Sequence, residues 1–343
     1  MAHDENAHIC YKVPELFFED GNIVLSAEAN SGTHLYKLHK GVLFAHSSVF
    51  SDILSLPSTT SAMTDVNEYY ESTPVVHLSD NPDDLTSLLK AFYYPSWRRN
   101  AQNCVQVLPT LILAQKYMAD DIRSAIVSQI EAEWPQNIWQ WDSLENESAL
   151  KPEELRYFAI GPFGGPDEKM PASEWDDYFP EPASAIQLAR VADIPSILPA
   201  AFYQLSRTRP SDDFDEWRSP EGTQLDPMRE FKDDKRTARW SRLSKDDLYR
   251  LMLGKEAMSE YASALRATIF NDTKFCSVVC ADTWKYAPSL KSDDILADLQ
   301  ELCKPRSSPG ALMCERCRMK VNIRGVKERA TVWNELKTFF HLV

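Results

Sequence analysis

Two close pairs of cysteines in the C-terminal third of the chain have the residue type and the spacing of metal ligands. Three residues separate Cys276 from Cys280, and two separate Cys314 from Cys317. Four thiolates from two short segments can supply the tetrahedral sulfur set that Zn²⁺ prefers. The second spacing is typical of a zinc-binding turn, and the first places both sulfurs on one face of a helix. The sequence therefore indicates a structural zinc site formed by Cys276, Cys280, Cys314 and Cys317.

A second interpretation treats these cysteines as small apolar core residues, which is also the expectation for Cys10 and Cys104. Cys303 and His341 are further candidate ligands near the two pairs. A catalytic zinc is not expected, because four thiolates leave no open position for water. The seven cysteines are an odd number and nothing in the sequence indicates secretion, so thiols rather than disulfides are expected.

Patterns that indicate enzymatic catalysis are not found in the sequence. It contains no nucleophile elbow, P-loop, dinucleotide-binding fingerprint or HExxH motif. The histidines are scattered, and the carboxylate pairs Asp176-Asp177 and Asp246-Asp247 lie at expected loops and helix starts. We therefore expect a protein that is not an enzyme, with no catalytic residues and no cofactor other than the candidate zinc.

Composition predicts a folded, acidic protein. The 343 residues are 43% hydrophobic and 11% aromatic, which is enough for real cores. The 51 acids and 37 bases leave a formal charge of −14, and such a surface disfavours nucleic acid and anionic lipid as partners. No apolar run approaches membrane-spanning length and the N-terminus lacks the pattern of a signal peptide. The expected location is cytoplasmic or nuclear.

Strand and helix signals alternate between residues 14 and 135. The runs Ile23–Ala27 and Thr33–His39 predict a hairpin, and Pro74–Leu78 predicts a third strand. Residues 79–84 predict a capped helix start, and two further helices follow with apolar faces. This order predicts an α+β domain over residues 14–135, with a small sheet flanked by helical hairpins. Residues 1–13 are predicted to be a flexible tail.

Residues 136–343 predict a mostly α-helical C-terminal region. Glycine and proline predict a loop near 161–182, and mixed charges predict another near 206–240. Ser244 begins a capping box that predicts a helix, which Gly254 is expected to separate from a second helix. A final helix is predicted over Ala330–Leu342.

The segment Leu35-Tyr-Lys-Leu-His-Lys-Gly-Val-Leu-Phe-Ala-His-Ser-Ser-Val-Phe50 resembles the signature of a BTB/POZ domain. That family has the same order of strands and helices and binds proteins rather than performing chemistry. The whole chain is similar to the large BTB-domain family of mushroom-forming (basidiomycete) fungi. The similar phrases are Phe44–Pro57, Pro74–Pro82, Asp193–Arg207 and the closing Trp333-x-x-Leu336.

The resemblance implies a protein–protein interaction module that self-associates through its BTB domain, as a scaffold or as a cullin-3 ubiquitin-ligase adaptor. Tyr94–Gln102 lacks the apolar-x-Glu element associated with cullin binding and carries arginines there. Lys40, His46, Ser47 and Asp52 are the residues of this domain with most potential for partner contact. The alternative is a zinc-stabilised nuclear transcription-associated factor. Lys304–Arg329, with eight bases and two acids, favours it, although the segment lacks interleaved aromatics and a histidine pair.

Overall fold

The chain forms two compact units, Met1–Glu133 and Trp134–Val343. A computed structural model describes residues 10–55, 69–96, 104–148, 181–211, 238–285, 290, 292–303 and 313–342. The division falls two residues before the predicted end of the first domain. Most of both predicted loops, 161–180 and 212–237, lies outside the described residues.

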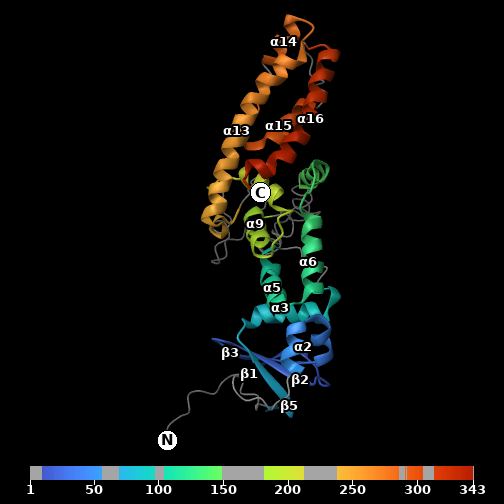
Figure 1. Cartoon of the computed structure of the whole chain (residues 1–343), viewed down its shortest axis with the longest axis vertical. Helices are drawn as coiled ribbons and strands as arrows, with labels where there is room; N and C mark the ends of the chain where they lie inside the picture. The colour runs from blue at the N-terminus through green and yellow to red at the C-terminus, as the bar shows by residue number, and fades with distance from the viewer. Residues whose placement is uncertain are drawn as a thin grey trace, which may run out of the picture. The chain divides into compact units, whose positions relative to one another are not determined.

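The N-terminal unit contains a five-stranded sheet in the order β1-β3-β2-β5-β4, with α3, α5 and α6 on one side of it (Figure 1). β2 and β3 form the predicted antiparallel hairpin, while β2 pairs in parallel with β5. Val24, Leu35 and Val75 form a buried cluster on one face of these three strands. The strands are β1 (Cys10–Phe17), β2 (Ile23–Ala29), β3 (Gly32–Leu38), β4 (Tyr69–Tyr70) and β5 (Thr73–Leu78).

The prediction of a flexible tail over residues 1–13 was wrong for residues 10–13. These residues begin β1, which pairs in parallel with β3 at the edge of the sheet. Most β1 side chains are exposed or half-buried, so the strand lacks the apolar alternation that would predict it. The edge position also tolerates Pro14, which cannot donate to a neighbouring strand. β4 was missed for a related reason, because it is short and lies in a polar stretch that predicts a loop.

The helices of the N-terminal unit follow the predicted order. Asn81 caps α3, accepting hydrogen bonds at Oδ1 from the N–H groups of Asp83 and Asp84. Tyr36 joins the sheet to this helix by donating from its hydroxyl to the carbonyl of Pro82 at 2.8 Å. The helices are α1 (Lys40–His46), α2 (Ser48–Ser55), α3 (Pro82–Tyr93), α5 (Cys104–Lys116) and α6 (Asp120–Glu133).

Ser47 was wrongly predicted to have potential for partner contact. Its side chain is buried, and its Oγ donates to the carbonyl of Tyr117 at 2.6 Å, so it joins the α1–α2 connection to the end of α5. His46 pairs with Asp121 at 2.7 Å, and Asp52 is exposed. Asn22 accepts a hydrogen bond from the N–H of Lys40 at the start of α1.

The C-terminal unit is helical, as predicted. Its elements are α9 (Pro182–Val191), α10 (Leu198–Ser206), η1 (Trp240–Arg242), α13 (Lys245–Thr273), α14 (Val278–Lys285), η2 (Ser292–Asp294), α15 (Ile295–Cys303) and α16 (Glu315–Phe339), with a further helix over 138–148. Arg207 follows the last residue of α10, and its side chain is 3% exposed. It joins α10 to the 138–148 helix and to η2. Its guanidinium donates to Glu145 at 2.8 Å and to Asp294 at 2.8 Å. The buried charge is thus paired with carboxylates of the 138–148 helix and of η2.

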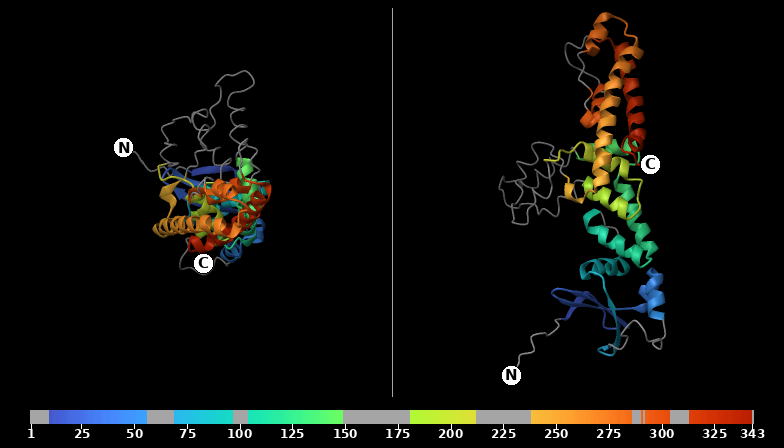
Figure 2. Two further views of the ribbon diagram at one scale, coloured as in Figure 1. Left: turned by 90° about the horizontal axis from the view of Figure 1, so that it is seen from above. Right: turned by 60° about the vertical axis from the view of Figure 1, so that its left-hand side comes forward.

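The long helices α13 and α16 pack against each other in antiparallel directions (Figures 1 and 2). The expected separation of two helices at Gly254 was wrong, because α13 is continuous from Lys245 to Thr273. Gly254 is buried within α13, and the ring of Phe340 lies directly on its backbone. The missing side chain therefore permits close packing instead of ending the helix.

The final helix begins at Glu315 rather than at the predicted Ala330. Residues 315–329 place apolar side chains on two faces of the helix among many charged ones, so no single apolar face predicts this part of the helix. Ser244 caps α13 as predicted, since its Oγ accepts from the N–H of Asp247 at 3.1 Å.

We predict that Gly254→Ala destabilises the C-terminal unit. A methyl group there would overlap the ring of Phe340. Overpacking of this kind costs about 1–3 kcal/mol, and the higher helix propensity of alanine offsets only about 1 kcal/mol of it. Differential scanning calorimetry of the full chain should show a lower unfolding temperature for this unit.

Gly41→Ala is the matched control, because a methyl group at that helical glycine meets nothing within 4 Å. We expect it to leave stability unchanged or to raise it by up to about 1 kcal/mol. Equal effects of the two substitutions would show that the Phe340 contact does not control the packing of α13 on α16.

Candidate metal centre

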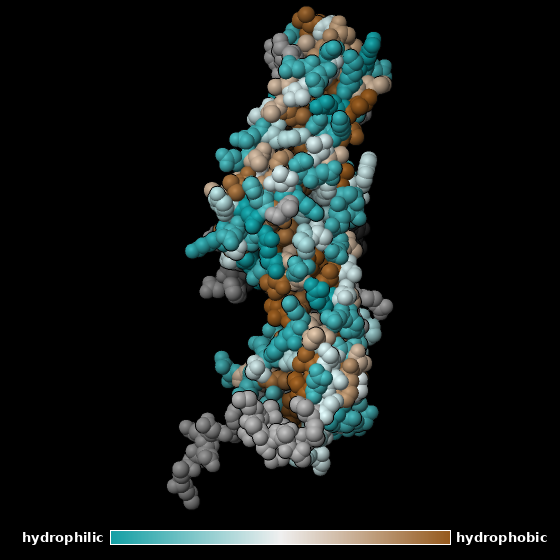
Figure 3. Space-filling model, in the orientation of Figure 1, coloured by the Kyte–Doolittle hydropathy of each residue, from teal (hydrophilic) through white to brown (hydrophobic). Residues whose placement is uncertain are grey.

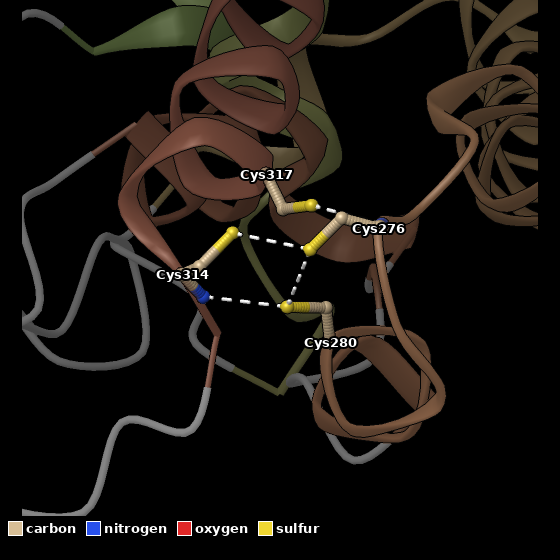
Figure 4. A group of neighbouring side chains, drawn as sticks. All are labelled: Cys276, Cys280, Cys314 and Cys317. Atoms are coloured by element: carbon tan, nitrogen blue, oxygen red, sulfur yellow. Dashed lines mark hydrogen bonds between the residues drawn. The ribbon is translucent and has the colours of Figure 1, made fainter.

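The four cysteines predicted to bind zinc lie together at one end of the α13–α16 pair (Figure 4). We call Cys276, Cys280, Cys314 and Cys317 the cysteine cluster. Their sulfurs all lie within 4.8 Å of one another. The Cys276 sulfur is 3.6 Å from that of Cys280 and 3.4 Å from that of Cys314. Four thiol sulfurs this close together have the composition and proximity of a tetrahedral zinc site.

Both cysteine pairs lie at helix N-termini. Cys314 is the N-cap of α16, and Cys317 is the third residue of that helix. Cys276 lies two residues before α14, and Cys280 is the third residue of α14. The positive end of each helix dipole stabilises negative charge, so both helix starts favour the thiolate form that a metal requires.

Two backbone N–H groups bind sulfurs across the cluster. The N–H of Cys276 donates to the sulfur of Cys317 at 3.4 Å, and the N–H of Cys314 donates to the sulfur of Cys280 at 3.3 Å (Figure 4). In each case the first cysteine of one pair contacts the second cysteine of the other pair. Hydrogen bonds of this kind stabilise a thiolate and orient it toward a bound metal.

These contacts shift the pKa values of two of the cysteines in opposite directions. The N–H of Cys314 and the hydroxyl of Ser277 lower the pKa of Cys280 to about 7. Hydrogen bonds with the sulfurs of Cys314, Cys317 and Cys280 raise the pKa of Cys276 to about 12. The hydrogen bonds from Cys276 to the sulfurs of Cys280 and Cys314 require protons on some of these thiols. A bound Zn²⁺ would replace those protons.

Lys274 and Lys320 position the first cysteine pair, and sequence reasoning did not identify either. Lys274 follows the last residue of α13 with a positive φ of 42°, a left-handed conformation that turns the chain away from the helix axis. Lys320 of α16 donates from Nζ to the carbonyls of Thr273 and Lys274, at 3.3 and 3.4 Å. These bonds fix the end of α13 beside the start of α16. A lysine in a basic helix carries no sequence signal for this role.

Cys303, His341, Cys10 and Cys104 belong to other segments of the chain. His341 follows the C-terminal end of α16, and the 25 residues of that helix span about 37 Å. Cys303 ends α15, and its side chain lies outside the described residues. Cys10 and Cys104 belong to the N-terminal unit. The expectation that these two are buried was wrong for Cys10, which is exposed on the edge strand, and Cys104 is half-buried.

The cluster provides a closed set of sulfur donors. Cys280 and Cys317 are buried, whereas Cys276 and Cys314 are exposed. If all four sulfurs bind one Zn²⁺, no coordination position is left for water or substrate, and the metal acts structurally. It would cross-link the start of α14 to the start of α16.

Comparison of the chain with protein-family models, with curated proteins and with solved structures gives no match. Among the described residues, no helix combines the length and the apolar character needed to cross a membrane.

We predict that the purified protein binds one Zn²⁺ per chain, measured by inductively coupled plasma mass spectrometry. Cys317→Ser removes a buried donor and should abolish stoichiometric zinc and lower the unfolding temperature of the C-terminal unit. A strong chelator should have the same effect on the unmodified protein, because metal binding contributes directly to folding.

Cys104→Ser is the matched control, since Cys104 lies outside the cluster. It should retain one zinc per chain. A folded protein that contains no stoichiometric zinc after purification in zinc-supplemented medium would contradict the metal assignment.

Proposed function

We propose that this chain is a non-enzymatic protein-interaction protein of the BTB/POZ type, with a zinc-stabilised helical unit that presents a second binding surface. The observation that carries the proposal is the order of elements in the N-terminal unit. A β2–β3 hairpin is followed by α1 and α2, by β5 pairing in parallel with β2, and then by α3, α5 and α6. This is the order that the BTB/POZ resemblance implies for residues 14–135.

Exposed apolar side chains on the first helix pair support self-association. Phe44 of α1 is 37% exposed and Ile53 of α2 is 41% exposed. Both lie in or next to the segment that resembles the family signature. Exposed large apolar side chains are candidates for contacts at interaction surfaces.

The closed cysteine cluster supports a binding role for the C-terminal unit rather than a catalytic one. A four-sulfur zinc site orders the ends of helices and has no free position for chemistry. In the proposed arrangement the N-terminal unit self-associates or recruits a common component, while the helical unit holds a specific partner. Recruitment of cullin-3 is the adaptor form of this proposal, and it requires binding by the N-terminal unit.

We predict that the protein self-associates in solution and that Phe44→Asp with Ile53→Asp weakens this. Each substitution places a charge on an exposed apolar position, so the fold should be retained while the apolar contact is lost. Multi-angle light scattering over a concentration series should show a shift toward the 39.2 kDa monomer. Tyr69→Asp, at a 69% exposed position on β4, is the control.

Affinity capture tests the recruitment of partners. Tagged full-length protein and a variant lacking residues 14–135 are incubated with cell extract and with the purified N-terminal domain of cullin-3. Cullin-3 bound only by the full-length chain would establish the adaptor form. A protein that stays monomeric at all concentrations and loses no partner on deletion would contradict the proposed function.

A further inference from the structure

Helix α16 carries an exposed line of apolar side chains. Met319, Ile323 and Val326 are 58%, 64% and 52% exposed, and Ala330 is exposed beside them. We call these four residues the apolar stripe. Hydrophobic side chains are visible at the surface over α14 and α16 (Figure 3).

The apolar stripe is additional to the face with which α16 packs in its own unit. Val321, Gly325 and Val332 are buried on the opposite side of the helix, where α16 contacts α13 and α15. A helix with one apolar face needs one packing partner, whereas α16 has apolar residues on two faces. Exposed apolar residues at successive turns of one helix mark an interaction site more often than single ones do.

The spacing of the apolar stripe fits another helix. Its members follow one another at intervals of four, three and four residues, which is the pattern of a helix–helix seam. Eleven residues of helix rise about 16 Å, or three turns. A partner helix of about three to four turns would cover the stripe.

The charges beside the apolar stripe indicate the partner's chemistry. Arg316, Lys320 and Lys327 are exposed along one edge of it. Among the described residues, neither Arg316 nor Lys327 has an ion pair or side-chain hydrogen bond. Of the two acids in residues 315–330, Glu315 is exposed in the first turn of α16, and Glu328 is buried and occupied by Tyr261 and Arg324. The surface is therefore apolar and basic, on a protein whose formal charge is −14.

We propose that the apolar stripe binds an acidic amphipathic helix of a partner protein. Apolar residues of that helix would cover Met319, Ile323 and Val326, and carboxylates along its edge would pair with Arg316 and Lys327. The inference deepens the proposed function and rests on it, since it gives the helical unit a partner of defined chemistry. A second copy of this chain fits less well, because antiparallel pairing would place the same basic edge against itself.

The test uses the zinc-loaded full-length protein and a synthetic helical peptide of four turns with leucines along one seam and glutamates on its edges. Fluorescence anisotropy measures binding. Ile323→Asp should weaken binding at least tenfold, and Val278→Asp, at a 75% exposed apolar position in α14 outside the stripe, should leave it unchanged. Zinc content and unfolding temperature verify that both variants fold.

A charge exchange tests whether binding depends on the basic side chains beside the stripe or only on nonspecific apolar contact. Arg316→Glu with Lys327→Glu should weaken binding of the glutamate peptide and restore binding to a peptide in which lysines replace the glutamates. Equal binding of both peptides by the unmodified protein, or binding unaffected by Ile323→Asp, would overturn the proposal. So would self-association that is lost in Ile323→Asp, because a second copy would then occupy the stripe.

Failure of this inference is distinguishable from failure of the proposed function. If the peptide does not bind while the N-terminal unit still self-associates or captures its partner, the stripe proposal fails alone. If neither self-association nor capture occurs, the proposed function fails.

Discussion

The contact between Phe340 and the backbone of Gly254 sets the register of the C-terminal unit. It holds α13 and α16 close together at one end of their antiparallel pair. Further along the pair, the hydroxyl of Tyr261 donates to the carboxylate of Glu328 at 2.8 Å. A guanidinium nitrogen of Arg324 lies 3.4 Å from a carboxylate oxygen of Asp272. The cysteine cluster lies at the far end. Each helical residue turns by about 100°, so a shift of one residue between the helices would point Cys317 away from its partners. Packing at Gly254 and sulfur geometry at Cys317 thus depend on the same register.

Polar groups inside the unit restrict which helices can pair. Arg207 is almost fully buried, and its fork of donors requires carboxylates in fixed positions on the 138–148 helix and on η2. Glu328 is buried in α16. Burial of the Tyr261 hydroxyl, and then its hydrogen bond to Glu328, raises the pKa of that tyrosine. Leaving such charges unpaired would cost several kcal/mol each, on the order of 3–5. Alternative packings of these helices are therefore disfavoured even where their apolar faces would match.

Local signals were predictable from sequence, and contacts between distant segments were not. The capped start of α3 within residues 79–84, the Ser244 cap and the β2–β3 hairpin depend on neighbouring residues, and all three were predicted. The cysteine cluster was predictable because only a few residue types bind zinc. Gly254 was misread, since a glycine that admits an aromatic ring from 86 residues away looks the same as one that ends a helix. β1 was missed because its mostly exposed side chains show little apolar alternation, and the first part of α16 was missed because its apolar residues are divided between two faces.

Helix α16 combines three roles, and this has a thermodynamic consequence. Its buried face packs in the unit, its first turn supplies Cys314 and Cys317, and its exposed face carries the apolar stripe, which begins at Met319. Met319 lies within one turn of Cys317, so the order of that turn would affect the binding of a metal and of the proposed partner alike. Two ligands that both favour the same ordered helix are linked, and each strengthens the binding of the other by the same factor. If Zn²⁺ binds the cysteine cluster and a partner binds the apolar stripe, the metal would strengthen partner binding although it has no catalytic position.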